Sequence, residues 1–227
     1  MFERLKRNIF LGKAASQALA ETNGLSAWAG AQGFSHADLG ESKGFSLTGM
    51  VGNKTWRLEC RRSSRDYILG EQLRARAELQ LDCGASVLIM SRPLKETLEK
   101  RAYQICTDTL QTTADPSLTE EMRWLALYPE VGWDELPKAF WDRYAVLADQ
   151  RSHAMDWIDS ALAGLLMSWP EPATDTPLPF ILMLLRGKAY LRMQYTPADL
   201  PTLQHAIQIF TAACASALAA RTTDITF

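Results

Sequence analysis

The sequence predicts an α+β protein in which an antiparallel sheet precedes a helical segment, a later β-hairpin and a C-terminal helix. Apolar residues recur at every second position in much of 45–92, and at every third or fourth position in several later segments. These are the periods of half-buried strands and of amphipathic helices. Short turn signals between the alternating segments favour an antiparallel β-meander with one buried face. We therefore expect a meander over about 45–92 and a hairpin over about 180–195.

Composition is that of an ordinary globular chain. Hydrophobic residues make up 47% and charged residues 22% of the 227 residues, which is enough to build a sizeable core. We expect a single α+β domain over 1–227, with 1–40 as an N-terminal helical arm that could move independently. The segment "EPATDTPLP" marks an alternative division near 170–178. The formal net charge of −2 gives no overall field that would attract nucleic acid.

The first sheet is predicted from four alternating segments. "FSLTGMV" and "TWRLECR" flank Gly52-Asn53, a signal for a tight hairpin turn. "DYIL" is expected to form a short strand. The clearest alternation follows over 73–81, and "SVLIMS" is expected to be the next strand of the same meander. Residues 21–44 show no clear period and are expected to be loop.

Helices are expected after Pro93. Apolar stripes predict them over 94–111, from Ser117 to about 127, from Asp134 through Leu147, and over 158–169. The hairpin around Arg186-Gly187-Lys188 either extends the first sheet or forms a second small lobe. Thr196, Pro197 and Asp199 suit the start of the last helix.

Two observations favour a cytoplasmic location. The four cysteines are far apart and include no Cys-x-x-Cys pair, as expected in a reducing compartment. No apolar run approaches the ~20 residues of a membrane-spanning helix. The N-terminal segment imitates a signal peptide, but Glu3 and Lys13 interrupt its basic and apolar parts.

The arginine-rich stretch 54–82 carries seven positive and five negative residues. Interleaved acids argue against a nucleic-acid surface and favour a solvated sheet face. Within it, Arg61, Arg62 and Arg65 lie close together with two serines between them. Three guanidiniums on one turn could hold a phosphate or carboxylate group, so these residues are the candidate anion site.

Asp149, His153 and Asp156 share one face of a predicted helix and could supply metal ligands. That face opposes the apolar stripe, so a solvated acid–histidine arrangement is the alternative. His205 lies opposite the stripe of the last helix and is expected to meet solvent. The common nucleotide, hydrolase and metalloprotease motifs are absent, so no cofactor is expected.

Trp141 and Trp157 lie off the apolar stripes of their predicted helices, which indicates a second buried surface: a sheet, another subunit or a ligand pocket. Our leading hypothesis is a non-catalytic interaction or scaffold protein that self-associates as a homo-oligomer. The alternative is a binding protein or enzyme for a small anionic ligand. A second alternative is peripheral membrane association through the basic amphipathic segment 1–11.

Overall fold

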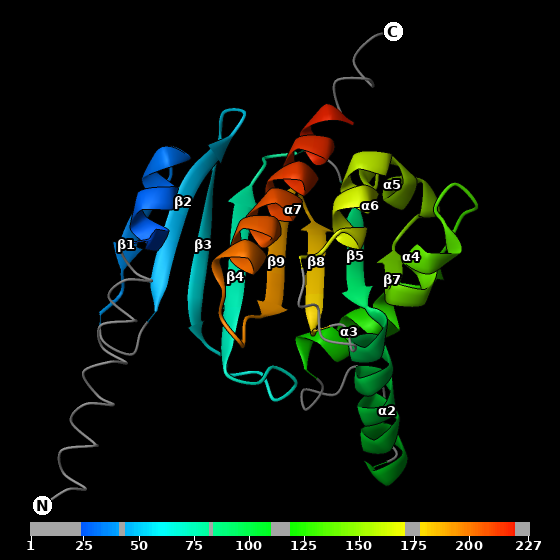
Figure 1. Cartoon of the computed structure of the whole chain (residues 1–227). Helices are drawn as coiled ribbons and strands as arrows, with labels where there is room; N and C mark the ends of the chain where they lie inside the picture. Colours follow the sequence, from blue (N-terminus) through cyan, green and yellow to red (C-terminus); the bar gives the residue numbers. More distant parts are fainter. Residues whose placement is uncertain (1–23, 41–43, 82–83, 110–118, 171–177, 221–227) are drawn as a thin grey trace, which may run out of the picture.

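The structure is a computed structural model of the chain, and it describes residues 24–40, 44–81, 84–109, 119–170 and 178–220. Its centre is a sheet of nine described strands in the order β1-β2-β3-β4-β9-β8-β5-β7-β6, and every pairing is antiparallel (Figure 1). The strands are β1 (Ser35–Asp38), β2 (Phe45–Val51), β3 (Lys54–Arg62), β4 (Glu71–Glu78), β5 (Ser86–Ser91), β6 (Glu130–Val131), β7 (Tyr144–Ala148), β8 (Phe180–Leu185) and β9 (Lys188–Gln194). The helices are α2 (Arg92–Thr109), α3 (Glu120–Leu127), α4 (Lys138–Arg143), α5 (Arg151–Trp157), α6 (Ser160–Met167) and α7 (Leu200–Ala219), with a further helix over 24–31.

One face of the sheet is covered by helices along most of its width. Helix α7 crosses the central strands, α5 and α6 lie beside it, and the helix over 24–31 lies over the β1 side (Figure 1). The larger apolar core fills this layer, because the inward residues of every long strand point into it. Asp199 caps α7 by accepting a hydrogen bond from the backbone N–H of Thr202 at 2.8 Å.

The opposite face is covered at one end only. Residues of α2 and α3 pack with Leu88, Met90, Ile181 and Met183 in a second, smaller core over β5, β7 and β8. Strands β5 and β7 are therefore buried on both faces. Over β3, β4 and β9 the same face carries charged side chains, and neither α2 nor α3 covers it.

The register shows how abruptly this face changes. In one row across the sheet, Leu88 lies opposite Met183, Met183 opposite Tyr190, Tyr190 opposite Arg76, and Arg76 opposite Arg57. The row is apolar under the helices and cationic where the sheet is open. The candidate functional site lies at this boundary between the helix-covered part and the open part of the sheet.

The predicted fold class is confirmed, as are both hairpins. Each hairpin turns through two residues, and Gly52, Arg186 and Gly187 adopt the positive φ that such turns require. The predicted meander is wrong in one respect: β5 does not pair with β4, because the β8–β9 hairpin lies between them. The hairpin thus extends the first sheet, and strands from both sides of 171–177 share one sheet.

Three local predictions were also wrong. The helix expected from Asp134 through Leu147 is the short helix α4 followed by strand β7. A strand buried on both faces has a continuous apolar run without alternation, and "YAVLA" imitates part of a helical stripe. Residues 21–44, expected to be loop, include the helix over 24–31 and strand β1. "DYIL" forms no strand; it belongs to the loop between β3 and β4.

Candidate functional site

The open part of the sheet is hollowed. A depression of about 500 Å³ lies over β3, β4 and β9, and a second of about 520 Å³ continues from it toward α3. Both are lined by Arg74, Met183, Tyr190 and Arg192. We call the two depressions together the arginine groove.

Basic side chains of the groove are arranged in opposed pairs. Arg57 on β3 is the register partner of Arg76 on β4, and Arg74 on β4 is the register partner of Arg192 on β9. Like charges directly opposite each other destabilise a sheet unless other groups compensate them. Backbone pairing therefore concentrates four guanidiniums on adjacent strands at a cost that the fold has to offset.

Carboxylates compensate three of these guanidiniums: Arg57 and Arg76 on the open sheet face, and Arg192 through the buried Glu121. Glu59 lies 2.9 Å from Arg57. Glu78 pairs with Arg76, and it also lies 3.3 Å from Lys188. Hydrogen bonds from Arg76 and Lys188 hold the pKa of Glu78 below its usual value, so this carboxylate is ionised at neutral pH.

Arg74 differs from its neighbours. Its register partner on β3 is Glu59, but that carboxylate is already engaged by Arg57 and, at 3.1 Å, by Arg61. Within the described ranges, no carboxylate lies within 4.0 Å of the Arg74 guanidinium. Arg74 is exposed and lines both depressions. Arg74 is therefore a cation at the centre of the groove, and no carboxylate of the described residues compensates its charge.

The groove also has an aromatic and apolar side. The Arg76 guanidinium lies 5.9 Å from the centre of the Tyr190 ring in a cation–π arrangement. Tyr190 is only partly buried, so part of its ring is accessible from the groove. On the α3 side the lining includes Trp124, Leu127, Tyr128, Met183 and Leu185, together with the charged residues Glu120, Arg186 and Lys188. A ligand in the groove would therefore meet cations and apolar surface in both depressions.

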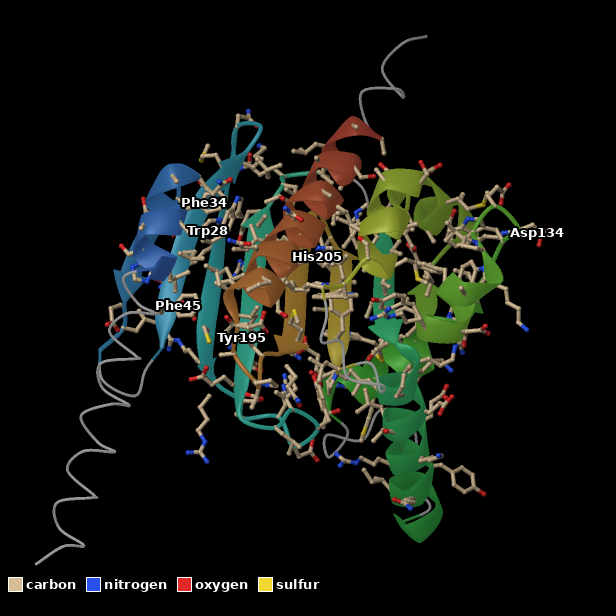
Figure 2. All side chains as sticks on the ribbon, in the orientation of Figure 1. Trp28, Phe34, Phe45, Asp134, Tyr195 and His205 are labelled. Carbon is tan, nitrogen blue, oxygen red and sulfur yellow. The ribbon has the colours of Figure 1, made fainter. Side chains whose placement is uncertain are left out.

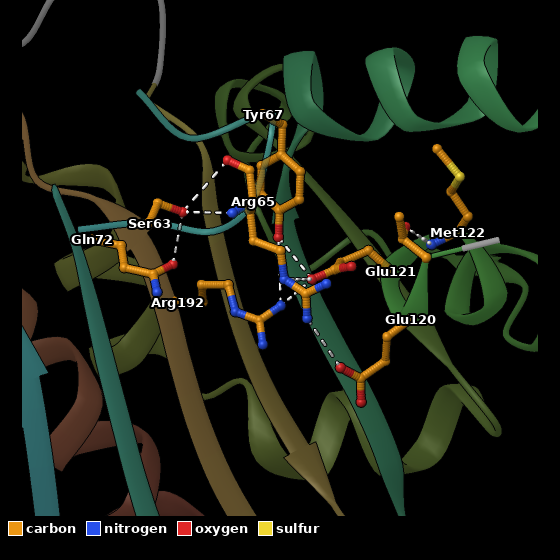
Figure 3. Close-up of polar contacts among 9 residues, drawn as sticks. Ser63, Arg65, Tyr67, Gln72, Glu120, Glu121, Met122 and Arg192 are labelled. Carbon is orange, nitrogen blue, oxygen red and sulfur yellow. Dashed lines mark hydrogen bonds and ion pairs between the residues drawn. The ribbon is translucent and has the colours of Figure 1, made fainter. Parts of the chain in front are cut away.

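An ion cluster around the buried Glu121 lies at the start of α3, and its member Arg192 also lines the groove (Figure 3). The Glu121 side chain is 0% exposed, and its Oε1 accepts a hydrogen bond from the Tyr67 hydroxyl at 2.8 Å. Arg192 donates to the same oxygen, and Arg65 Nε lies 3.3 Å from it. Burial, together with the Glu121 carboxylate, raises the pKa of Tyr67 well above its usual value, so the hydroxyl stays protonated and donates.

Local hydrogen bonds near the end of β3 and at the start of α3 position the residues of this cluster. Thr119 caps α3 by accepting a hydrogen bond from the Met122 N–H at 3.4 Å, which starts the helix with Glu120 and Glu121 in its first turn. The loop after β3 is held by Ser63, whose hydroxyl accepts from the Arg65 N–H at 2.9 Å and donates to Gln72 at 3.2 Å. These local contacts bring Arg65 and Tyr67 to the start of α3.

The structure separates the three arginines of the predicted anion site. Arg61 and Arg62 are consecutive in β3 and so point to opposite faces of the sheet. Arg61 pairs with Glu59, while Arg65 pairs with Glu121 and, at 3.6 Å, with Glu120. The three guanidiniums are therefore not brought together on one turn, because Arg61 and Arg62 belong to strand β3 and Arg65 belongs to the loop that follows it.

The structure does not assemble the predicted metal site. Asp149 Oδ1 lies 2.9 Å from His153 Nδ1, but Asp156 is exposed. Across the residues that the structure describes, no group of three or more His, Cys, Asp or Glu side chains is placed to hold a metal ion. Although burial opposes it, hydrogen bonds from His153 and from the backbone N–H of Ser86 and Gln150 lower the pKa of Asp149. The solvated alternative therefore describes this cluster better.

Both off-stripe indoles pack within the chain. Trp157 is 1% exposed, and its Nε1–H donates to the Ala213 carbonyl of α7 at 2.9 Å. Trp141 is partly buried, with its ring centre 5.0 Å from that of Trp133. The second surface of Trp157 is α7, so this indole has no face left for a subunit interface, whereas Trp141 keeps part of its surface exposed.

His205 was expected to meet solvent, and this expectation was wrong. On α7 it is 8% exposed, its Nε2 lies 2.8 Å from the Leu165 carbonyl oxygen, and its ring centre lies 4.9 Å from that of Trp169 (Figure 2). Helix α6 and Trp169 cover the side of α7 that the apolar stripe alone would leave in water.

Comparison with known proteins adds little. No known protein family matches the sequence, and no curated protein is significantly similar to it. Among solved structures, the chain is similar to the mycobacterial trehalose monomycolate transport factor A, TtfA, with 10% identity and a TM-score of 0.44. The match covers 85% of this chain and 90% of that chain. None of the described helices is long and apolar enough to cross a membrane.

Proposed function

We propose that this protein binds a small amphiphilic organic anion in the arginine groove, with the acidic group on Arg74 and the apolar part against Tyr190 and Met183. The observation that carries the proposal is the Arg74 guanidinium, which is exposed in a hollow and lacks a described carboxylate partner. A sulfonate, carboxylate or phosphate oxygen would satisfy it with a charge-assisted hydrogen bond.

The chemistry of the groove narrows the ligand class. Six lining residues are cationic and three are acidic, so the groove favours anions while the chain as a whole is slightly acidic. The apolar and aromatic residues of the lining favour a ligand with a hydrocarbon or aromatic part over an inorganic ion. This proposal keeps the anionic ligand that the sequence suggested and moves it from the β3–β4 loop to the open sheet face.

Fluorescence titration with anilinonaphthalene sulfonate tests the proposal. We expect saturable binding that weakens by about tenfold or more in Arg74→Gln, because a hydrogen bond to a charged group contributes roughly 1.5–3 kcal/mol. Phenylnaphthylamine, the same aromatic system without the sulfonate, should bind more weakly and should not respond to the substitution. Arg151→Gln is the matched control, since Arg151 is an exposed arginine on α5, away from the groove.

Equal loss of sulfonate binding in Arg74→Gln and Arg151→Gln would refute the proposal, as would equal affinity for the charged and neutral probes. Self-association as a homo-oligomer stays a proposal, and the buried Trp157 does not support it because its second surface is α7. Membrane association through 1–11 concerns residues outside the described part of the chain. We place the binding activity in the cytoplasm, as the isolated cysteines predict.

A further inference from the structure

Arg192 belongs to two environments at once. Its side chain is 11% exposed and lines both depressions of the arginine groove. Yet its Nη1 donates to the buried Glu121 carboxylate, away from the groove. A guanidinium has five N–H donors in a flat fork, so one arginine can exchange one anion for another without leaving its place.

The Glu121 carboxylate is bonded unevenly. Oε1 contacts Tyr67, Arg192 and Arg65, whereas Oε2 is buried and has no hydrogen-bond partner among the described residues. A buried acceptor left unpaired is costly for a charged group. If Arg192 turned away, Glu121 would still keep Tyr67 and Arg65. Of these three partners, Arg192 is the one that lines the arginine groove and could reach a ligand there.

We propose that Glu121 is an internal counter-anion that competes with the ligand for Arg192. This inference rests on the proposed binding of an organic anion in the groove. When an acidic ligand engages Arg192, the link between β9 and the first turn of α3 is broken, and α3 is held less firmly. The coupling is reciprocal: the factor by which ligand binding weakens the contact between Arg192 and Glu121 equals the factor by which that contact weakens ligand binding. A change that frees Arg192 from Glu121 should therefore raise the affinity for the ligand.

The negative charge of Glu121 could also weaken the binding of an anion by simple repulsion, without any competition for Arg192. Any carboxylate near the groove repels an anion, and Glu120 provides the comparison because it lines the groove, is 50% exposed and belongs to the same helical turn. Repulsion from Glu120 acts without Arg192. Competition by Glu121 acts only through Arg192.

A double-mutant cycle with anilinonaphthalene sulfonate separates the two. We expect Glu121→Gln to raise the probe affinity roughly fivefold or more, within the usual range of coupling between sites. In an Arg192→Gln background the same change should alter affinity by less than about twofold. Glu120→Gln should have the same small effect in both backgrounds.

Hydrogen exchange on the unaltered protein supplies a second measurement that needs no variant. Saturating probe should speed amide exchange in α3 while leaving α7 unchanged. Probe binding that is lost in Arg74→Gln but unaffected by Glu121→Gln, with no change in α3 exchange, would overturn this inference and leave the proposed function standing. Absence of saturable binding to the unaltered protein would remove both.

Discussion

Replacing Glu121 with alanine tests how much the buried ion cluster contributes to stability. The substitution leaves Arg192, which is 11% exposed, and the Tyr67 hydroxyl without their shared acceptor. Removing one partner of a buried ion pair costs roughly 3–5 kcal/mol. We expect the lower end, about 3 kcal/mol, because Arg192 can turn toward the groove and regain water.

Glu120→Ala is the matched control, since it removes the same side chain from the adjacent position. Glu120 is 50% exposed and lies 3.6 Å from Arg65, so its loss should cost about 1 kcal/mol or less. Both substitutions change helix propensity and the first-turn charge of α3 equally. The difference between the two variants, about 2 kcal/mol, therefore measures burial and pairing.

Urea unfolding followed by circular dichroism gives both free energies of unfolding by linear extrapolation. In thermal unfolding, a loss of about 3 kcal/mol corresponds to a decrease in Tm of roughly 6–12 °C for a chain of this size. Equal destabilisation of the two variants would show that burial of Glu121 has no special role. The description of the cluster would then be wrong.

Three further predictions concern the scaffold. A Cβ on Gly187 would lie 2.4 Å from the Leu81 carbonyl oxygen at a φ of +72°, so Gly187→Ala should destabilise the protein by about 1–3 kcal/mol. Gly164 lies on α6 with open space around it, so Gly164→Ala should stabilise the protein by roughly 0.5–1 kcal/mol. The Tm values of the two variants should therefore shift in opposite directions, and an increase for Gly187→Ala or a decrease for Gly164→Ala would contradict the respective prediction. Because the pKa of Asp149 is lower in the folded chain than its unfolded value of about 3.9, its stabilisation is present above that pH and is lost as the pH falls through the folded pKa. Asp149→Asn should therefore unfold at lower urea than the unaltered protein at pH 7 and at nearly the same urea near pH 2; a gap that widened in acid would refute the assignment.

Local patterns in the sequence predicted the elements whose stability is local. The β2–β3 and β8–β9 hairpins carry their own turn chemistry, and α7 carries both its cap at Asp199 and a long apolar stripe. Strand β7 was mistaken for helix because its apolar run reflects cover from both sides, and one of the covering helices, α2, lies far earlier in the chain. Burial by distant elements leaves no period in the strand itself.

The candidate site was beyond prediction for a related reason. The outward direction of Arg74 and Arg76 follows from the alternation in β4. Their neighbours Tyr190 and Arg192 come from a hairpin far along the chain, and the pairing of β4 with β9 leaves no local signal. Nor could the sequence show that Glu121 would be buried, because the start of an acidic helix is ordinarily solvated.

The place of the β8–β9 hairpin also dictates how this chain can fold. Strands β4 and β5 are neighbours in sequence but are separated in the sheet by two strands made much later in the chain. Until that hairpin docks, one sheet fragment ends in the bare edge of β4 and the other in the bare edge of β5. Contacts between such distant segments form slowly, and bare edges pair readily with other chains. Docking of the hairpin is thus the step at which folding and aggregation compete.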